Sequence, residues 1–303
     1  MTQAQSCSTR QPDILLGLIG EGISASRTPA LHMAEARAQG MVCSYRLLDT
    51  TTPPFAEKSL GEILATCERK GFAGVNVTHP FKQQAIGHLD ELSFIARKIG
   101  AVNTVLFRQG QRIGYNTDFS GYRAAFRSQM TDQPCGRVLL LGAGGAAAAV
   151  ARAFLDLGTR VLTIFDRDPT RAEALATSLS ADHPTVSVVP ISEPEARIVS
   201  VQDGVVNATP MGMAAYPGTA IDPALLAPRQ WVSDIVYFPL ETELILKARS
   251  AGCPVMSGAG MAIHQAAEAF RHFTGLAADP ARMASTFSSF ATTPPQTRSR
   301  TNA

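Results

Sequence analysis

The sequence carries almost no net charge. Its 27 lysine and arginine residues are balanced by 25 aspartate and glutamate residues, which leaves +2 over 303 residues. No long basic run interleaves with aromatic side chains. Proteins that hold nucleic acid or anionic membranes through charge usually display such a basic surface. We therefore expect no nucleic acid and no membrane among the partners.

Cysteine is scarce, and its spacing suggests no pairing. The five cysteines stand at positions 7, 43, 67, 135 and 253, without a Cys-x-x-Cys pair or a zinc-like spacing to histidine. An odd, scattered set of this kind argues against a disulfide framework. His79 and His264 have no second ligand at a useful spacing, so no metal site is expected.

Long hydrophobic runs are also missing. No apolar stretch approaches the roughly twenty residues that cross a bilayer. Residues 1–13 are polar and contain no hydrophobic segment of the kind that directs secretion. Together with the unpaired cysteines, these absences predict a cytoplasmic protein.

What the sequence does contain is an alternation of short apolar strands and helices. With 45% hydrophobic residues, the chain can bury the cores of two domains. The β-α-β order predicts an α/β fold in both. The predicted parts are a disordered tail (1–13), an α/β substrate-binding domain (14–130), a dinucleotide-binding domain (131–257), helices that return to pack on the first domain (258–290) and a second disordered tail (291–303). Helices are predicted over 29–39, 55–69, 91–99, 119–127, 146–157, 169–179, 241–251 and 261–274, with another starting at 81–82. Trp231 is predicted to lie in the core.

One stretch predicts a dinucleotide site. A buried strand over 138–141 runs into Gly142-Ala143-Gly144-Gly145 and then into an alanine-rich helix. The glycines allow a tight turn and let a pyrophosphate approach the N–H groups at the helix N-terminus. Asp166 ends the next strand, about twenty residues on, where such folds place an acid on the adenosine ribose. We predict a Rossmann-type, doubly wound parallel sheet.

Polar side chains follow three separate strands of the first domain. They are Asn76 and Thr78, Asn103 and Thr104, and Asn116, Thr117 and Asp118. Open α/β sheets bind ligands at the carboxyl ends of their strands, so these side chains predict a site for one small polar ligand. Taken alone, Asp118 could serve only as a helix N-cap.

Two further segments leave two interpretations open. Ser26 and Thr28 suit capture of a polyol or carboxylate, but both could also simply cap the helix that begins at Pro29. Lys82 follows a strand end, yet a lone lysine is usually a solvated surface charge.

Eight ordered motifs together support a resemblance. They are Ser26-Arg27-Thr28-Pro29, Asn76-Val77-Thr78-His79-Pro80-Phe81-Lys82, Gly100-Ala101-Val102-Asn103-Thr104, Asn116-Thr117-Asp118, Gly142-Ala143-Gly144-Gly145, Asn207-Ala208-Thr209-Pro210-Met211-Gly212-Met213, Asp234-Ile235-Val236-Tyr237-Phe238-Pro239, and Gly260-Met261 followed by His264-Gln265-Ala266. From about residue 14 to 290 the chain resembles the quinate and shikimate dehydrogenase family.

The resemblance implies a role for each site residue. Lys82 and Asp118 would be the catalytic acid-base pair. The substrate carboxylate would meet Ser26, Thr28 and Tyr237, and the ring hydroxyls would meet Thr78, Asn103 and Gln265. The cofactor would meet Gly142, Ala143, Gly144, Gly145, Ala146, Asp166, Arg167, Arg171, Thr209, Met211 and Gly258. His79 and His264 are interpreted as orienting or packing residues.

Two departures from the usual family pattern bear on specificity. Ser-x-Thr at 26–28 resembles the quinate/shikimate enzymes, whereas biosynthetic shikimate dehydrogenases usually carry Ser-x-Ser. Asp166 would bond a free ribose diol and repel a 2′-phosphate, although Arg167 and Arg171 resemble the phosphate clamp of NADP-linked members.

The expected activity is therefore NAD-dependent oxidation of quinate to 3-dehydroquinate and of shikimate to 3-dehydroshikimate, with NADP as the other cofactor. A biosynthetic NADP-linked shikimate dehydrogenase, an aminoshikimate-type paralogue with another cyclic alcohol, and a non-catalytic metabolite sensor are the alternatives. Either a monomer or a homodimer is compatible with the sequence.

Overall fold

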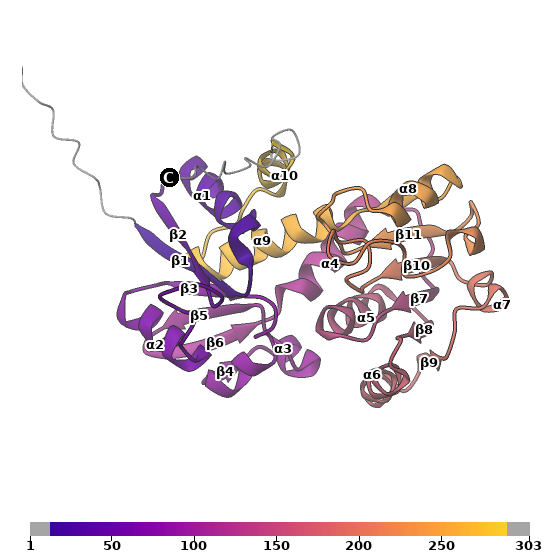
Figure 1. Ribbon diagram of the computed structural model, residues 1–303, viewed down its shortest axis with the longest axis horizontal. Coiled ribbons are helices and arrows are strands. Elements are labelled where there is room, and N and C mark those ends of the chain that lie inside the picture. The colour runs from indigo at the N-terminus through magenta and orange to yellow at the C-terminus, as the bar shows by residue number, and fades with distance from the viewer. Residues whose placement is uncertain (1–12, 290–303) are drawn as a thin grey trace, which may run out of the picture.

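The strands of the computed structural model, which describes residues 13–289, form two six-stranded sheets that lie side by side (Figure 1). The predicted tails, 1–13 and 291–303, lie outside the described residues except for Asp13. The first sheet has the order β2-β1-β3-β5-β6-β4. Its strands are β1 (Ile14–Gly20), β2 (Cys43–Asp49), β3 (Gly74–Val77), β4 (Glu91–Leu92), β5 (Thr104–Arg108) and β6 (Gln111–Tyr115).

The first sheet is mixed. Strand β1 pairs in parallel with β2 and β3, while β5 is antiparallel to both β3 and β6. Gln109 and Gly110, both with positive φ, form the two-residue turn between β5 and β6, a conformation that matches the twist of a hairpin. This hairpin returns the chain so that the polar residues after β6 lie beside those before β5.

The second sheet is entirely parallel and has the order β12-β11-β10-β7-β8-β9. Its strands are β7 (Arg137–Leu141), β8 (Val161–Phe165), β9 (Ser187–Ile191), β10 (Gly204–Asn207), β11 (Trp231–Asp234) and β12 (Val255–Met256). The strand order reverses between β7 and β10, which is the switch point where doubly wound sheets bind ligands. The predicted Rossmann-type sheet is confirmed.

Ten α-helices accompany the sheets within residues 13–289. They are α1 (Thr28–Ala38), α2 (Leu60–Arg69), α3 (Phe94–Ile99), α4 (Thr117–Gln129), α5 (Gly145–Leu157), α6 (Pro169–Asp182), α7 (Ala196–Val199), α8 (Glu243–Ser250), α9 (Gly258–Thr274) and α10 (Pro280–Ser289). The small alanines of α5 let it pack tightly on the sheet, and Ala147, Ala149, Ala151 and Ala153 are fully buried. Trp231 is also fully buried, as predicted, and stacks on Phe154.

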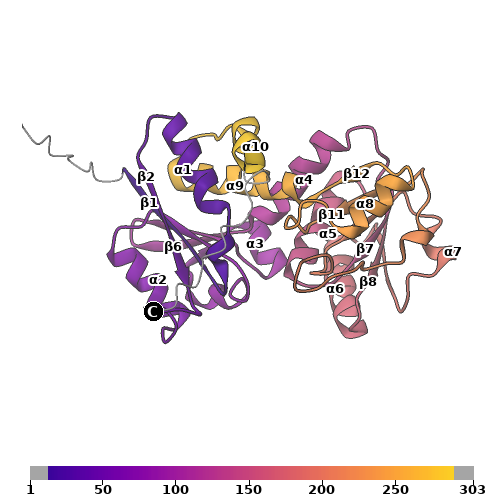
Figure 2. The same ribbon diagram turned by 45° about the horizontal axis from the view of Figure 1, so that its top comes forward.

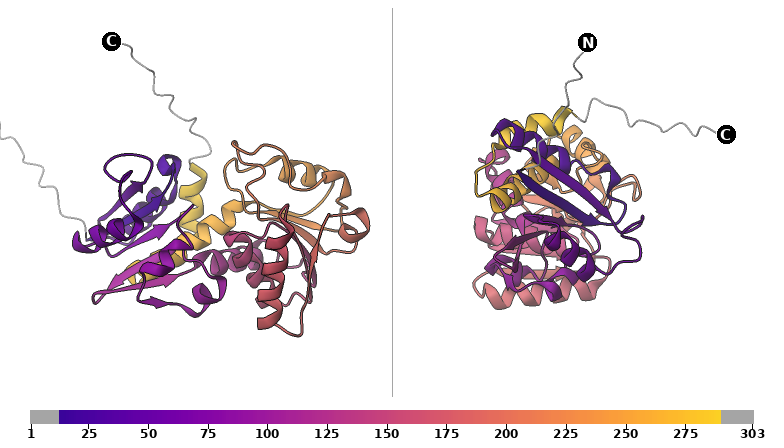
Figure 3. Two further views of the ribbon diagram at one scale, coloured as in Figure 1. Left: turned by 60° about the horizontal axis from the view of Figure 1, so that its bottom comes forward. Right: turned by 90° about the vertical axis from the view of Figure 1, so that its left-hand side faces the viewer.

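Helices α4 and α9 connect the two halves of the molecule (Figures 2 and 3). They pack so closely that a Cβ on Gly121 would lie 2.7 Å from the backbone nitrogen of Gln265. Helix α10 then packs on α1, where Arg282 donates to the buried carboxylate of Glu35 at 2.7 Å. The predicted return of the C-terminal helices to the substrate-binding half is therefore confirmed.

Several predicted helix boundaries are wrong, each for a local reason. The helix predicted over 91–99 begins at Phe94 because Ser93 caps it, and Glu91–Leu92 pair with β6 as a strand. The helix predicted from 55 begins at Leu60, where Ser59 and Glu62 form a capping box. After Lys82 the chain forms a 3-10 helix, Gln84–His88, in place of the α-helix predicted from 81–82.

Two capping predictions also need correction. Thr28 is the first residue of α1 and not its cap, since Arg27 occupies the N-cap position. Asn116 caps α4 by accepting from the N–H groups of Asp118 and Phe119, which leaves the Asp118 carboxylate available for other contacts.

Helix α9 starts at Gly258, three residues before the predicted position.

Candidate active site

The glycine turn after β7 leaves a helix N-terminus open. Gly142 has a φ of 102°, and a Cβ there would lie 3.0 Å from the carbonyl oxygen of Ala208. Gly144 is the N-cap of α5, has no side chain to cap the helix, and would present an added Cβ to open space. Free N–H groups at a positive helix end fit a phosphate group, so the turn suits a pyrophosphate.

Asp166 lies against this turn. Its Oδ2 accepts from the Ala143 N–H at 2.7 Å and its Oδ1 accepts from the Asp168 N–H at 2.9 Å. The carboxylate thus helps to shape the turn, a function that the sequence analysis did not anticipate. Arg167 and Arg171 are both exposed nearby in the chain.

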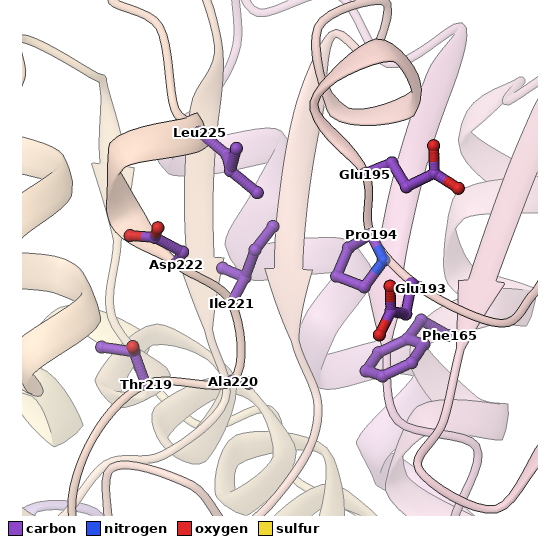
Figure 4. Close-up of a pocket in the computed structure, with 9 residues that line it drawn as sticks. All are labelled: Phe165, Glu193, Pro194, Glu195, Thr219, Ala220, Ile221, Asp222 and Leu225. Carbon is purple, nitrogen blue, oxygen red and sulfur yellow. The ribbon is translucent and has the colours of Figure 1, made fainter.

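A cavity of about 410 Å³ opens beside the end of β8 (Figure 4). Its apolar surface comes from Phe165, Pro194, Ala220, Ile221 and Leu225, and Glu193, Glu195, Thr219 and Asp222 add polar groups. Because Phe165 directly precedes Asp166, the cavity adjoins the segment expected to meet the adenosine ribose.

A buried polar cluster organises the loops that follow β10 and β11. Asn207 Oδ1 accepts from the Thr209 hydroxyl at 2.6 Å, and its Nδ2 donates to the Met211 carbonyl and to Asp234. Asp234 in turn accepts from the Thr242 hydroxyl at 2.7 Å. Burial raises the pKa of Asp234 to about 6, although these hydrogen bonds partly oppose the rise. The cluster therefore fixes the loop that carries Thr209 and Met211.

Gly258 fits closely against the loop after β11. A Cβ there would lie 2.4 Å from the carbonyl oxygen of Ile235. The start of α9 thus lies beside the segment that leads to Tyr237. Asn207 and Asp234 were not predicted as site residues, although both stand at strand ends within recognised motifs.

Lys82 and Asp118 form an ion pair at the edge of the first sheet. Lys82 Nζ lies 2.6 Å from Asp118 Oδ2, and Asn103 Nδ2 donates to the other carboxylate oxygen at 2.9 Å. The Asp118 side chain is only 3% exposed, whereas that of Lys82 is 26% exposed. The structure thus brings together three predicted site residues, with the lysine reaching solvent and the carboxylate held in the interior.

Tyr237 approaches this pair from the second sheet. Burial raises the pKa of its hydroxyl. The positive charges of Lys82 and Arg27 oppose this rise, and the negative charge of Asp118 adds to it. The residue is nevertheless 42% exposed, which indicates that part of the ring faces solvent. Arg27 lies 5.6 Å from the ring centroid of Phe238, so the loop after β11 also contacts the start of α1.

The remaining predicted residues lie around the same edge. Ser26 Oγ accepts from the Thr28 N–H at 3.3 Å. The methyl group of Thr78 lies 2.4 Å from where a Cβ on Gly20 would stand, just before the Ser26 loop. Gln265 faces α4 through its backbone, but its side chain has no described contact with Lys82 or Asp118.

The two halves meet between the glycine turn and the ion pair. A Cβ on Gly145 would lie 3.9 Å from that of Ala101, two residues before Asn103. The geometry therefore suits a reaction between a bound dinucleotide and a small polar molecule beside Lys82. Among residues 13–289, no group of three or more potential metal ligands is found, and no helix is long and apolar enough to span a membrane.

Comparison with known families gives three matches in order along the chain. Residues 18–105 match the shikimate dehydrogenase substrate binding domain, 126–212 match shikimate / quinate 5-dehydrogenase, and 258–286 match the shikimate 5′-dehydrogenase C-terminal domain.

Individual relatives agree over nearly the whole length. The chain is 47% identical over 281 residues to a shikimate dehydrogenase (NADP(+)) of Pseudarthrobacter chlorophenolicus, which covers 92% of this chain and 96% of the relative. It is 46% identical over 276 residues to a quinate/shikimate dehydrogenase (NAD(+)) of Corynebacterium efficiens, with 90% and 97% covered.

A solved structure shows the same fold. Quinate dehydrogenase from Corynebacterium glutamicum in complex with NAD superposes with a TM-score of 0.88 at 45% identity, covering 91% of this chain and 99% of that one. The identity and coverage exceed what a shared fold alone requires, and the chain belongs to the shikimate and quinate dehydrogenase family.

Proposed function

We propose that the protein is an NAD-dependent dehydrogenase that interconverts quinate with 3-dehydroquinate and shikimate with 3-dehydroshikimate. The observation that carries this proposal is the Lys82–Asp118 ion pair, which lies beside the meeting point of the two sheets. The family relationship and the NAD-linked relatives support it.

The residues of the second sheet fit a dinucleotide. The open N–H groups at the start of α5 would bind the pyrophosphate, and Asp166, already beside the turn, would face the adenosine ribose. Thr209, Met211 and Gly258 belong to the segments that would line the nicotinamide end. The bound cofactor would supply the hydride acceptor for oxidation of the C3 alcohol.

The residues of the first sheet would bind and deprotonate the alcohol. Ser26, Thr28 and Tyr237 would bind the carboxylate, while Thr78, Asn103 and Gln265 would orient the ring hydroxyls. Lys82 and Asp118 would hold the C3 hydroxyl and transfer its proton, since loss of a hydride from the carbon requires loss of the hydroxyl proton. In the reverse direction the same pair would return the proton.

Charge around the adenosine end supports NAD as the preferred cofactor. Asp166 and Asp168 would lie beside a bound 2′-phosphate, which would bring two further negative charges. Glu193, Glu195 and Asp222 line the adjoining cavity. Like charges at short range repel, which disfavours NADP. The exposed Arg167 and Arg171 support NADP-linked shikimate dehydrogenase as the second candidate.

Initial rates with quinate and shikimate, each with NAD⁺ and NADP⁺, test the proposal. Robust quinate oxidation with NAD⁺ is the expected result. Activity confined to shikimate with NADP⁺ would overturn the cofactor and substrate assignment in favour of the second candidate. Absence of activity with all four pairs would overturn both and point to an aminoshikimate-type or other cyclic alcohol.

We further propose that residues 14–130 and 131–257 act as substrate and cofactor domains in a cytoplasmic monomer or homodimer. Free thiols at Cys43, Cys67, Cys135 and Cys253 support a reducing compartment. Light scattering of the purified protein would decide its oligomeric state.

A further inference from the structure

A chain of buried hydrogen bonds runs from β2, the edge strand of the first sheet, to the Lys82–Asp118 pair. The Tyr45 hydroxyl donates to Asn76 Oδ1 at 2.8 Å, and Asn76 Nδ2 donates to Thr104 Oγ1 at 3.0 Å. Thr104 Oγ1 donates to Asn103 Oδ1 at 3.0 Å. Asn103 Nδ2 then donates to Asp118 Oδ1, as described above.

Every bond in this chain points the same way. Each residue between Tyr45 and Asp118 accepts a hydrogen bond from the preceding member and donates one to the next, so the series ends on a carboxylate. Hydrogen bonds aligned in this way polarise one another, and the low dielectric of the interior strengthens them. Each asparagine amide has one orientation, because a flip would turn the Asn76 amide oxygen toward the Asn103 carbonyl and the Asn103 amide oxygen toward the Asp118 carboxylate.

The strand pairing explains how these residues meet. Asn76 in β3 is the register partner of Thr104 in β5, and β1 separates β3 from β2, which carries Tyr45. Thr104 is fully buried, and Tyr45, Asn76 and Asn103 are at most 9% exposed. Burial raises the pKa of Tyr45 well above its usual range, so its hydroxyl keeps the proton that it donates.

Thr104 is the central member, because its single hydroxyl hydrogen holds the amide oxygen of Asn103. The Thr117 backbone N–H and hydroxyl also reach that oxygen. Asn103 is therefore held from two directions, with its NH₂ group directed at Asp118. Loss of one support would loosen the amide without removing it.

We propose that Thr104 and Asn76, anchored by Tyr45, are positioning residues that orient Asn103 and thereby the Asp118 carboxylate and Lys82. This inference rests on the proposed function, because it assigns the cluster to alcohol oxidation. It does not require any of the three to contact substrate. Misplacement of a catalytic group by a fraction of an ångström lowers turnover, with losses of up to about 100-fold for a displacement of 1 Å.

The test compares Thr104→Val with Thr104→Ser in the full chain. Valine keeps the shape but removes the hydroxyl, whereas serine keeps the hydroxyl. We expect Thr104→Val to lower kcat about tenfold or more with a change in quinate KM of less than about threefold. Thr104→Ser should recover most of the kcat, and NAD binding measured by fluorescence should be unchanged in both.

A second pair of variants compares two buried tyrosines. One stands at the start of the hydrogen-bond chain, and the other lies outside it. Tyr45→Phe should lower kcat several-fold, and Tyr122→Phe, a fully buried tyrosine in α4 that is not part of the chain, should not. This pair carries the test if Thr104→Val does not fold.

The outcomes separate this inference from the proposed function. A wild-type enzyme that oxidises neither quinate nor shikimate contradicts the function itself. Wild-type activity that persists unchanged in Thr104→Val overturns the positioning role. A rise in quinate KM at constant kcat also overturns it, because the hydrogen-bond chain would then support substrate binding and not the Lys82–Asp118 pair. Equal losses in Thr104→Val and Thr104→Ser would also overturn it, since the hydroxyl would then not matter.

Discussion

Lys82 Nζ lies 2.6 Å from Asp118 Oδ2, so the cation and the carboxylate share one hydrogen bond while Asn103 holds the second carboxylate oxygen. The two residues come from separate segments, one after β3 and one at the start of α4. Because the lysine side chain is 26% exposed and the aspartate side chain 3%, a substrate would approach the lysine side of the pair. In the proposed mechanism, a bound alcohol would therefore meet Lys82 first, with Asp118 held behind it by Asn103.

Replacing Lys82 with alanine should nearly abolish turnover. Removal of a general acid-base group typically costs about 10²- to 10⁴-fold in rate, and the residues proposed to bind the cofactor belong to the second sheet. We therefore expect NAD binding, measured by fluorescence titration, to remain within about twofold of wild type. Lys247→Ala, at an exposed lysine in α8 whose ion pair with Glu243 is a surface contact, is the matched control. Turnover in Lys82→Ala equal to that of the control would remove Lys82 from the mechanism.

Replacing Asp166 with asparagine should reduce the preference for NAD over NADP. The substitution removes a negative charge beside the proposed position of a 2′-phosphate and leaves Arg167 and Arg171 in place. We expect the ratio of kcat/KM values for NAD⁺ and NADP⁺ to fall on the order of tenfold, or about 1.4 kcal/mol.

The outcome can be separated from damage to the turn. Asp166 accepts from the Ala143 N–H, so a weaker turn would lower kcat/KM with NAD⁺ as well. The amide oxygen of asparagine can still accept that hydrogen bond, which limits this loss. Asp168→Asn, which removes the second repelling charge at the N-cap of α6, should lower the ratio by less. An unchanged cofactor ratio in Asp166→Asn would show that other residues discriminate between the cofactors.

Local sequence signals predicted the second sheet and its turn well. The glycines at 142–145, the apolar strands and Asp166 act within one β-α-β unit, so their pattern is readable without long-range contacts. The capping box of Ser59 and Glu62 is an equally local signal, and recognising it would have corrected the start of α2. The predicted convergence of three polar strand ends followed from a general rule, because open α/β sheets bind ligands at the carboxyl ends of their strands.

The contacts that hold the site could not be predicted in the same way. Tyr45 reaches Asn76 only because β1 lies between β2 and β3, and strand order is a property of the whole fold. Asn207 and Asp234 join two loops whose distance apart depends on the pairing of β10 with β11. A strand-end asparagine is equally consistent with a ligand contact or a structural one until its partners are known.

His32 should make the protein sensitive to acid. It is fully buried in α1 against Tyr45, Phe270 and Phe273, and neither ring nitrogen has a hydrogen-bond partner among the described residues. Burial lowers the pKa of His32 from 6.5 to about 3. Below pH 6.5 the unfolded chain binds a proton that the folded chain does not, so the stability present above pH 6.5 is lost as the pH falls toward 3.

Replacing His32 with leucine should remove much of this loss. We expect the free energy of unfolding of His32→Leu, measured by urea denaturation, to fall less than that of wild type between pH 6.5 and 4, by about 1–3 kcal/mol. His183→Gln, at a partly exposed histidine after α6, should follow the wild-type curve. Parallel curves for wild type and His32→Leu would show that His32 does not remain neutral when folded.

Asp234 should have the opposite pH dependence. Its pKa is raised from 3.8 to about 6, mainly by burial, so between these values the folded chain binds a proton that the unfolded chain has lost. The stability that protonated Asp234 contributes is therefore fully present below about pH 3.8 and is lost as the pH rises through 6. Above pH 6 the buried charge persists because Asn207, Thr242 and the Val236 N–H donate to it.

Asparagine at position 234 tests this balance. Its amide oxygen can still accept from Asn207 and the Val236 N–H, while no charge is buried. We expect Asp234→Asn to gain about 1–3 kcal/mol of unfolding free energy relative to wild type between pH 4 and 7, whereas exposed Asp132→Asn should show no such trend. A pH-independent loss in Asp234→Asn would instead mean that the hydrogen bond from Thr242 to an ionised carboxylate outweighs the cost of burying the charge, because only that bond requires the second oxygen.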